Sequence, residues 1–231
     1  MKTFRSSGAF PERPFYRLDE IERICAEELQ SVGLYPAAPE PIRIDRFVEK
    51  RFNVVPAYEV LPEGILGYTR FGKAGVEAIV VAQALDAGNS RVSERRIRTT
   101  LAHEAGHGLL HMHLFLDTGQ ASLFNDSGKQ GPQLLCRDLP DTDRSNKYRG
   151  QWPEFQANRC IGGLLMPRRL ALLATEEFTI VQGRMGTRTF DEARRAAAVH
   201  HLAELFDVNP VVADIRLKEL FTTGGGAQQS F

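Results

Sequence analysis

The sequence predicts an α+β fold, in which a small antiparallel sheet packs on a histidine-bearing helix and the C-terminal part is mostly helical. Three observations support this prediction. Three short apolar runs, separated by proline- and glycine-containing turns, occupy residues 54–82, which is typical of short strands. In residues 90–113, apolar side chains recur at helical spacing around a pair of histidines. Beyond residue 151 the apolar spacing is again helical.

Residues 1–40 are interpreted as an N-terminal leader followed by a helix. The first part, residues 1–16, contains charges and prolines but no apolar core, so we expect an irregular or mobile segment. Asp19 is a suitable N-cap for a helix that runs to about Val32, and Gly33 is a suitable stop.

A short helix and three strands are expected before the histidine-bearing helix. Turns with hairpin chemistry at residues 62–64 and 72–75 separate the strands, which predicts antiparallel pairing between neighbours. The predicted elements are a helix over Ile42–Phe52 and strands over Val54–Leu61, Ile65–Phe71 and Val76–Ala82.

The central motif places His103 and His107 four residues apart, with Glu104 directly after the first. On a helix, residues i and i+4 lie on one face, so both imidazoles can reach a single ion at about 2.0–2.1 Å. Glu104 is rotated about 100° from His103, off the ligand face, but it can lean over a water bound to the ion. This is the arrangement of a general base beside a metal-activated water. The alternative is two ordinary helix histidines at a chance spacing.

The context of the motif favours the metal site. Residues 90–98 provide a polar helix start. Gly106 and Gly108 are poor helix formers, each costing about 0.8–1.0 kcal/mol relative to Ala, which suggests that something packs closely beside the histidines. The apolar face of the helix consists of Ile97, Leu101, Ala105, Leu109 and Met112.

A long break follows at residues 117–151, rich in Asp, Gly, Ser, Asn and Arg. A loop of this length inside a compact domain is uncommon and often functional. Two interpretations stay open: a substrate-facing lid, or a surface insertion without a role. Cys136 has no Cys or His partner at metal-site spacing and is interpreted as a free thiol.

A catalytic zinc site needs three protein ligands and one open position. His111 lies two helical turns from His103, about 12 Å along the axis, so it cannot easily share the ion. Glu154 is the better candidate, on a helix that Pro153 opens at a favourable first-turn position. Asn158, one turn later on the same face, could orient a ligand imidazole.

The remaining chain is expected to form helices. His200 and His201 are interpreted as solvated or core-edge residues. The segment 188–221 has helix-turn-helix length with a turn at residues 207–210, and residues 222–231 form a loose tail. The predicted helices cover Arg168–Glu177, Asp191–Phe206 and Pro210–Phe221.

The composition excludes several classes of partner. Lys plus Arg and Asp plus Glu both number 29 among the 231 residues, so no global field attracts nucleic acid or an anionic membrane. No apolar run approaches the length of a membrane span. Three cysteines without a CxxC pair suggest a reducing compartment. We therefore expect a cytoplasmic protein with no membrane partner.

Two segments resemble the ImmA/IrrE family of metallopeptidases. Residues 101–111 read LAHEAGHGLLH, close to the family pattern LAHELGHxLLH, and residues 154–167 read EFQANRCIGGLLMP, close to ExxANxFAxxLLMP. The predicted sheet and the C-terminal helices are also similar, so the resemblance covers roughly residues 41–220. The sequence departs from the family in a longer insertion between the motifs and in Cys160-Ile161-Gly162, which replaces the packing pair FA.

The resemblance implies a zincin-like fold for residues 41–187, with the insertion at 117–151, and a zinc ion as cofactor, Mn²⁺ being the alternative. Known relatives cleave, or control through cleavage, a helix-turn-helix repressor of a mobile element or a stress regulon. The implied protein substrate is therefore such a repressor, encoded nearby. The metal-ligand positions fall on His103, His107 and Glu154, and the catalytic position falls on Glu104.

Two functions from different classes are weighed. The first is a metal-dependent endopeptidase acting on a regulatory protein, with Glu104 as general base and Tyr148 as a candidate donor to the developing oxyanion. The second is a DNA- or protein-binding regulator that uses the C-terminal helices and has a structural metal site. Its last helix carries few basic residues, Arg216 and Lys218, so protein docking or core packing is favoured over direct DNA binding.

Overall fold

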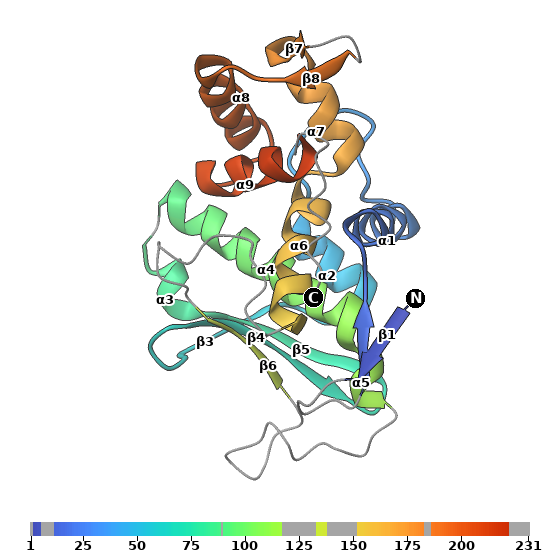
Figure 1. Ribbon diagram of the computed structural model, residues 1–231. Coiled ribbons are helices and arrows are strands. Elements are labelled where there is room, and N and C mark those ends of the chain that lie inside the picture. Colours follow the sequence, from blue (N-terminus) through green and yellow to red (C-terminus); the bar gives the residue numbers. More distant parts are fainter. Residues whose placement is uncertain are drawn as a thin grey trace.

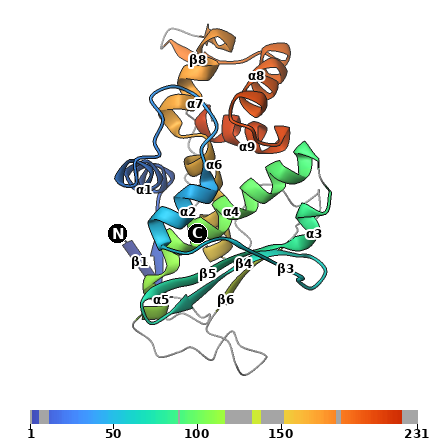
Figure 2. The same cartoon turned by 180° about the vertical axis from the view of Figure 1, so that it is seen from behind.

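The fold is α+β, as predicted, with a small sheet on one side of a layer of helices (Figures 1 and 2). Helices α2, α4 and α6 lie on the same side of the sheet, and the C-terminal helices lie farthest from it. None of the helices in the described ranges has the length and apolar character needed to cross a membrane. The computed structural model describes residues 2–5, 12–88, 90–116, 133–137, 152–182 and 186–221.

The sheet has the strand order β3-β5-β4-β6 and is mixed. β4 and β5 form the predicted antiparallel hairpin, in which Gly72 pairs with Gly75. β3 runs parallel to β5, so the prediction of a wholly antiparallel sheet is wrong. The reason is that β5 lies between β3 and β4, and the segment 62–64 is a crossover rather than a hairpin turn. The strands are β3 (Ala57–Glu59), β4 (Ile65–Gly72), β5 (Gly75–Ala82) and β6 (Gln133–Arg137).

The interval 117–151 is not a continuous loop. Its residues 133–137 form β6, which pairs antiparallel with β4 and extends the sheet. The remainder of the interval, including Tyr148, lies outside the described residues, as does the side chain of Cys136. The lid, the oxyanion donor and the free thiol therefore stay predictions.

The N-terminal segment contains a β-hairpin, which the prediction of an irregular leader missed. β1 (Lys2–Arg5) and β2 (Glu12–Phe15) pair antiparallel. Proline is tolerated in edge strands, which is why Pro14 does not prevent the pairing. The following helix α1 (Leu18–Ser31) has Arg17 as its N-cap, so the prediction of Asp19 as the cap is wrong by two residues, and Asp19 lies in the first turn.

Helix α4 (Arg91–His111) occupies the centre of the fold, between the sheet and α6 (Trp152–Leu165). Ser90 is its N-cap and accepts a hydrogen bond from the Ser93 backbone N–H at 3.2 Å. A methyl group on Gly106 would lie 2.7 Å from Cβ of Cys160 on α6, so the close packing predicted beside the histidines is confirmed. Three short helices contact α4, namely α2 (Ile44–Phe52), α3 (Gln83–Asp86) and α5 (His113–Leu116).

The C-terminal part is mostly helical, but it also contains a small unpredicted hairpin. β7 (Ile180–Gln182) and β8 (Thr187–Thr189) pair antiparallel after a 3-10 turn at Glu176–Phe178. The predicted helices are confirmed as α7 (Arg168–Thr175), α8 (Glu192–Leu205) and α9 (Pro210–Leu220). The predicted tail at 222–231 lies outside the described residues.

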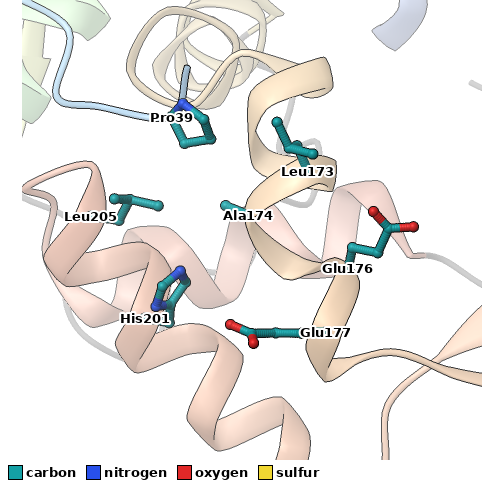
Figure 3. Close-up of a pocket in the computed structure, with 7 residues that line it drawn as sticks. All are labelled: Pro39, Leu173, Ala174, Glu176, Glu177, His201 and Leu205. Atoms are coloured by element: carbon teal, nitrogen blue, oxygen red, sulfur yellow. The ribbon is translucent and has the colours of Figure 1, made fainter.

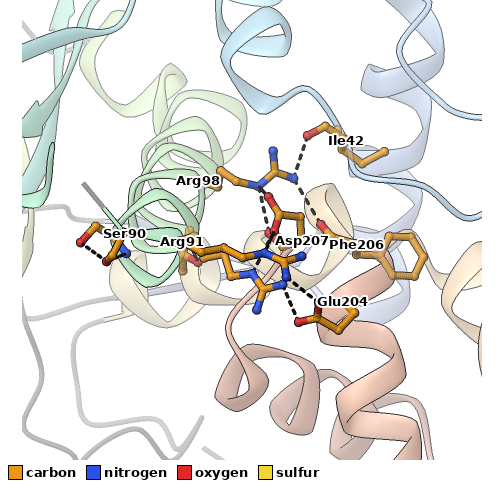
Figure 4. A network of polar contacts seen from close by, with 10 residues as sticks. Ile42, Ser90, Arg91, Arg98, Glu204, Phe206 and Asp207 are labelled. Carbon is orange, nitrogen blue, oxygen red and sulfur yellow. Dashed lines mark hydrogen bonds and ion pairs between the residues drawn. The ribbon is translucent and has the colours of Figure 1, made fainter. Parts of the chain in front are cut away.

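An ion-pair network attaches the turn between α8 and α9 to the start of α4 (Figure 4). Arg95 donates to Asp207 at 2.9 Å and to Glu204 at 2.8 Å, and Arg91 donates to Glu204 at 2.6 Å. Arg98 donates to the backbone carbonyl of Asp207 at 3.0 Å. The turn between α8 and α9 is therefore bound to the central helix.

Candidate metal centre

Three metal-binding side chains converge where α4 and α6 pack together. The Nε2 atoms of His103 and His107 are 3.0 Å apart. The two carboxylate oxygens of Glu154 lie 3.2 Å from them, Oε2 from the first imidazole and Oε1 from the second. The absence of a side chain at Gly106 allows the two helices to approach this closely. The predicted ligand set thus meets at one point, all its ligand atoms lying within 4.8 Å of one another.

The chemistry of the cluster fits a metal ion. Two ligand atoms of a tetrahedral zinc ion at about 2.0–2.1 Å lie roughly 3.4 Å apart, close to the observed separations. Burial lowers the pKa of His107, which keeps its imidazole neutral. Burial alone would raise the pKa of Glu154, but His107 and His103 outweigh it, and the carboxyl is ionised. Neutral imidazole and carboxylate are the forms that bind metals, so the cluster can hold an ion.

His103 is oriented by an amide on α6. Its Nδ1 lies 3.0 Å from Oδ1 of Asn158, which can accept the ring N–H. With Nδ1 protonated, the Nε2 lone pair faces the cluster, which is the tautomer that a metal ligand needs. The structure therefore places Asn158 where the sequence predicted it.

His107 is oriented by two residues that the sequence analysis did not assign. Its Nδ1 lies 3.0 Å from Nδ1 of His111, and Nε2 of His111 lies 3.0 Å from Oε1 of Gln156. The Gln156 amide donates in turn to the Pro14 carbonyl oxygen at 2.8 Å. Burial lowers the pKa of His111 well below its ordinary value. A third histidine at i+4 from His107 was the available sequence signal for this contact.

Glu104 lies fully buried beside the ligands, outside the three-residue cluster. Oε2 accepts a hydrogen bond from the Thr69 hydroxyl on β4 at 2.6 Å. Oε1 has no hydrogen-bond partner within the described ranges. Burial raises the pKa of Glu104 to about 8, against the lowering effects of His103 and Thr69. The carboxyl group can therefore exchange a proton near neutral pH, as a general base requires.

The approach of the sheet to Glu104 depends on a glycine. A methyl group on Gly67 of β4 would lie 2.7 Å from the Val80 carbonyl oxygen, 2.8 Å from Cγ2 of Thr100 and 3.2 Å from Oε1 of Glu104. Real Cβ atoms essentially never come within 3.0 Å of such neighbours. The strand can lie this close to α4 because position 67 lacks a side chain.

His201, which the sequence analysis placed outside the metal site, lies apart from the metal cluster. His201 lines an open pocket of about 530 Å³ in the C-terminal part, between α7 and α8 (Figure 3). No member of the metal cluster lines this pocket, and His201 is half-buried, in agreement with its interpretation as a core-edge residue. The pocket is lined by Pro39, Leu173, Ala174, Glu176, Glu177, His201 and Leu205.

No protein-family model matches the chain, and a search of curated proteins finds no match. The geometry of the centre is therefore the basis for a functional assignment. It brings together His103, His107 and Glu154, places Glu104 beside them, and adds Asn158 behind one ligand.

Proposed function

We propose that the protein is a metal-dependent endopeptidase of the ImmA/IrrE type, with a zincin-like fold and zinc as its ion. The observation that carries the proposal is the buried Glu104, with one carboxylate oxygen lacking a hydrogen-bond partner among the described residues, directly after the ligand His103. A purely structural metal site has no need of such a group. A zinc ion held by the two histidines and Glu154 would supply Lewis acidity and lower the pKa of a bound water.

Glu104 has the properties of the group that moves the proton. Its Oε1 would take a proton from the nucleophilic water and return it to the amine of the leaving peptide. Thr69 holds the other oxygen at 2.6 Å and so orients the carboxylate. The raised pKa of about 8 makes Glu104 a stronger base in the metal-free chain. A nearby cation would lower the pKa of Glu104 from this value.

The proposed substrate is a protein, and by resemblance a helix-turn-helix repressor encoded nearby. A regulatory peptidase must spare other proteins, which requires recognition outside the metal cleft. The interval 117–151 and the C-terminal helices are the candidate regions for this. We expect a limited cut in the cognate repressor and poor activity on casein or short generic peptides.

The structure gives little support to the alternative of a DNA-binding regulator. Arg216 is fully buried and forms an ion pair with Glu22 of α1, so it cannot contact phosphate. Lys218 forms an ion pair with Asp214 at 2.6 Å. Of the two basic residues on which DNA binding by α9 would depend, Arg216 is therefore unavailable and Lys218 lies on the surface in an ion pair within the helix, which supports core packing as the role of this helix.

The test compares variants of the metal centre on the cognate repressor. Glu104→Gln should retain the metal and lose cleavage, because the amide cannot take a proton. His107→Ala or Glu154→Ala should lose stoichiometric metal binding. His201→Ala, a histidine outside the cluster, is the control for both readouts. Cleavage by metal-loaded Glu104→Gln protein would rule out the general base, and stoichiometric metal in both ligand variants would rule out the site.

A further inference from the structure

A chain of hydrogen bonds connects the N-terminal strand β2 to the candidate metal centre. It runs from the Pro14 carbonyl to Gln156 on α6, then to His111 and His107 on α4, over distances of 2.8, 3.0 and 3.0 Å. All of its members are buried. The indole ring of Trp152 packs edge to face against His111, with the ring centroids 5.3 Å apart. The polar atoms of the chain therefore depend on one another for hydrogen bonding.

The direction of the chain follows from its first member. A carbonyl oxygen can only accept, so the Gln156 amide must present its NH₂ group to Pro14 and its Oε1 to His111. His111 must then carry its proton on Nε2 to donate to that oxygen. Its Nδ1 is left as an acceptor, so His107 donates from Nδ1. The lone pair on Nε2 of His107 consequently faces Glu154.

With neutral imidazoles, any other arrangement leaves two acceptors facing each other within the chain from Pro14 to His107. A rotated Gln156 amide would place Oε1 against the Pro14 carbonyl, and the other tautomer of His111 would place a lone pair against Oε1. Each unsatisfied buried group costs about 1–3 kcal/mol. This proton arrangement satisfies every contact from Pro14 to His107, and it turns the Nε2 lone pair of His107 towards Glu154 and His103, where a metal ion would accept it.

We propose that β2 is a component of the metal centre. Gln156 and His111 are positioning residues, through which the Pro14 carbonyl determines that His107 carries a proton on Nδ1. This inference rests on the proposed metal site and goes beyond its ligands. It assigns a role to the N-terminal hairpin, which no feature of the metal-binding motif implies.

The proton arrangement can be measured in the metal-free full-length protein without any mutation. Long-range ¹H–¹⁵N NMR spectra of histidine side chains distinguish the two neutral tautomers. We expect His107 to be protonated on Nδ1 and His111 on Nε2. Observation of His111 protonated on Nδ1, or on both nitrogens at neutral pH, would overturn the proposal whether or not the protein is a peptidase.

Zinc affinity, measured by competition with a chelator, tests the role of the two positioning residues. Removing comparable partners of metal-binding histidines typically weakens binding 10–100-fold. We expect losses of this size for His111→Leu and Gln156→Leu. His111→Gln should recover most of the affinity, because its amide oxygen can accept the His107 proton. Gln156→Glu should have an affinity between those of Gln156→Leu and the wild type, because its carboxylate accepts from His111 but repels the Pro14 carbonyl and so loses the contribution of β2.

The contribution of β2 has its own readout. Coupling is reciprocal, so if β2 supports zinc binding, then zinc must stabilise β2. Added Zn²⁺ should slow amide exchange in Glu12–Phe15 more than in the hairpin of β7 and β8, and Gln156→Glu should abolish this difference. Unchanged zinc affinity in His111→Leu and Gln156→Leu would refute the inference. If His107→Ala still abolished binding in that case, the metal site itself would stand.

Discussion

The hydroxyl of Thr69 on β4 lies 2.6 Å from Oε2 of Glu104 on α4, and 3.0 Å from the backbone carbonyl of the same residue. Both residues are fully buried. The sheet thus holds the side chain and the backbone of the proposed general base through one group. The ligands His103 and His107 lie on the same helix but make no hydrogen bond to Thr69 within the described ranges.

Replacing Thr69 should therefore separate catalysis from metal binding. Thr69→Val keeps the shape of the side chain but removes a hydrogen bond to a charged group, which is worth about 1.5–3 kcal/mol. We expect kcat/KM on the repressor to fall about 10–100-fold, with zinc affinity unchanged. Thr69→Ser, which keeps the hydroxyl, should recover most of the activity. Equal activity in the valine and wild-type proteins would show that the hydroxyl does not orient Glu104.

Asn158 should support zinc binding by His103. Its Oδ1 is 3.0 Å from Nδ1 of His103, so Asn158→Ala removes the acceptor and should weaken zinc binding about 10–100-fold. Asn158→Asp provides a stronger acceptor and should retain the affinity. Chelator competition measures both. Identical affinities for the alanine and wild-type proteins would reduce Asn158 to a helix-surface amide.

The pH dependence of stability should report on the network around Asp207. Burial alone would raise its pKa, but Arg95 and Arg98 outweigh it, so the native pKa lies below the ordinary 3.8. A lowered native pKa means that the stabilisation is present above pH 3.8 and is lost as the pH falls through the native value. Asp207→Asn should therefore cost about 1–2 kcal/mol at pH 7 and progressively less below pH 3.8.

The substitution Asp207→Asn preserves the backbone conformation at residue 207. Asp207 has a φ of +52°, which asparagine also tolerates, so the substitution changes charge without adding strain. Urea unfolding of the metal-free proteins at pH 7 and pH 3 gives the two free-energy differences. Asp19→Asn, in a solvent-exposed pair with Arg17, is the control and should have little effect. A difference for Asp207→Asn that stays constant with pH would contradict the ion-pair assignment.

Gly67→Ala should disturb the contact between the sheet and α4. The new methyl group would lie 2.7 Å from the Val80 carbonyl oxygen, a backbone atom that cannot move cheaply. We expect a loss of about 1–3 kcal/mol in the free energy of unfolding, as for other overpacked sites. Adding Thr100→Ser removes the methyl group 2.8 Å away and should restore only part of the loss. Full restoration would show that the backbone clash is unimportant.

Local sequence determined the helices of this protein and the contacts between residues one or two helical turns apart. The spacing of His103 and His107 predicted a shared ligand face, because helix geometry alone places residues i and i+4 together. The extents of α4, α6, α8 and α9 followed from apolar periodicity and cap residues. The pairing of Glu154 with that histidine face was also predicted, from the need for a third ligand and from family resemblance.

Only the tertiary structure decided the contacts between segments distant in sequence. The parallel pairing of β3 with β5, the strand β6 at 133–137 and the N-terminal hairpin depend on which strand edge each segment meets, and local pattern does not encode that choice. The same holds for the hydrogen bonds of Thr69 to Glu104 and of Gln156 to Pro14. Each joins groups whose partner is set by packing of whole elements, because a buried polar group must take whichever partner the fold brings within reach.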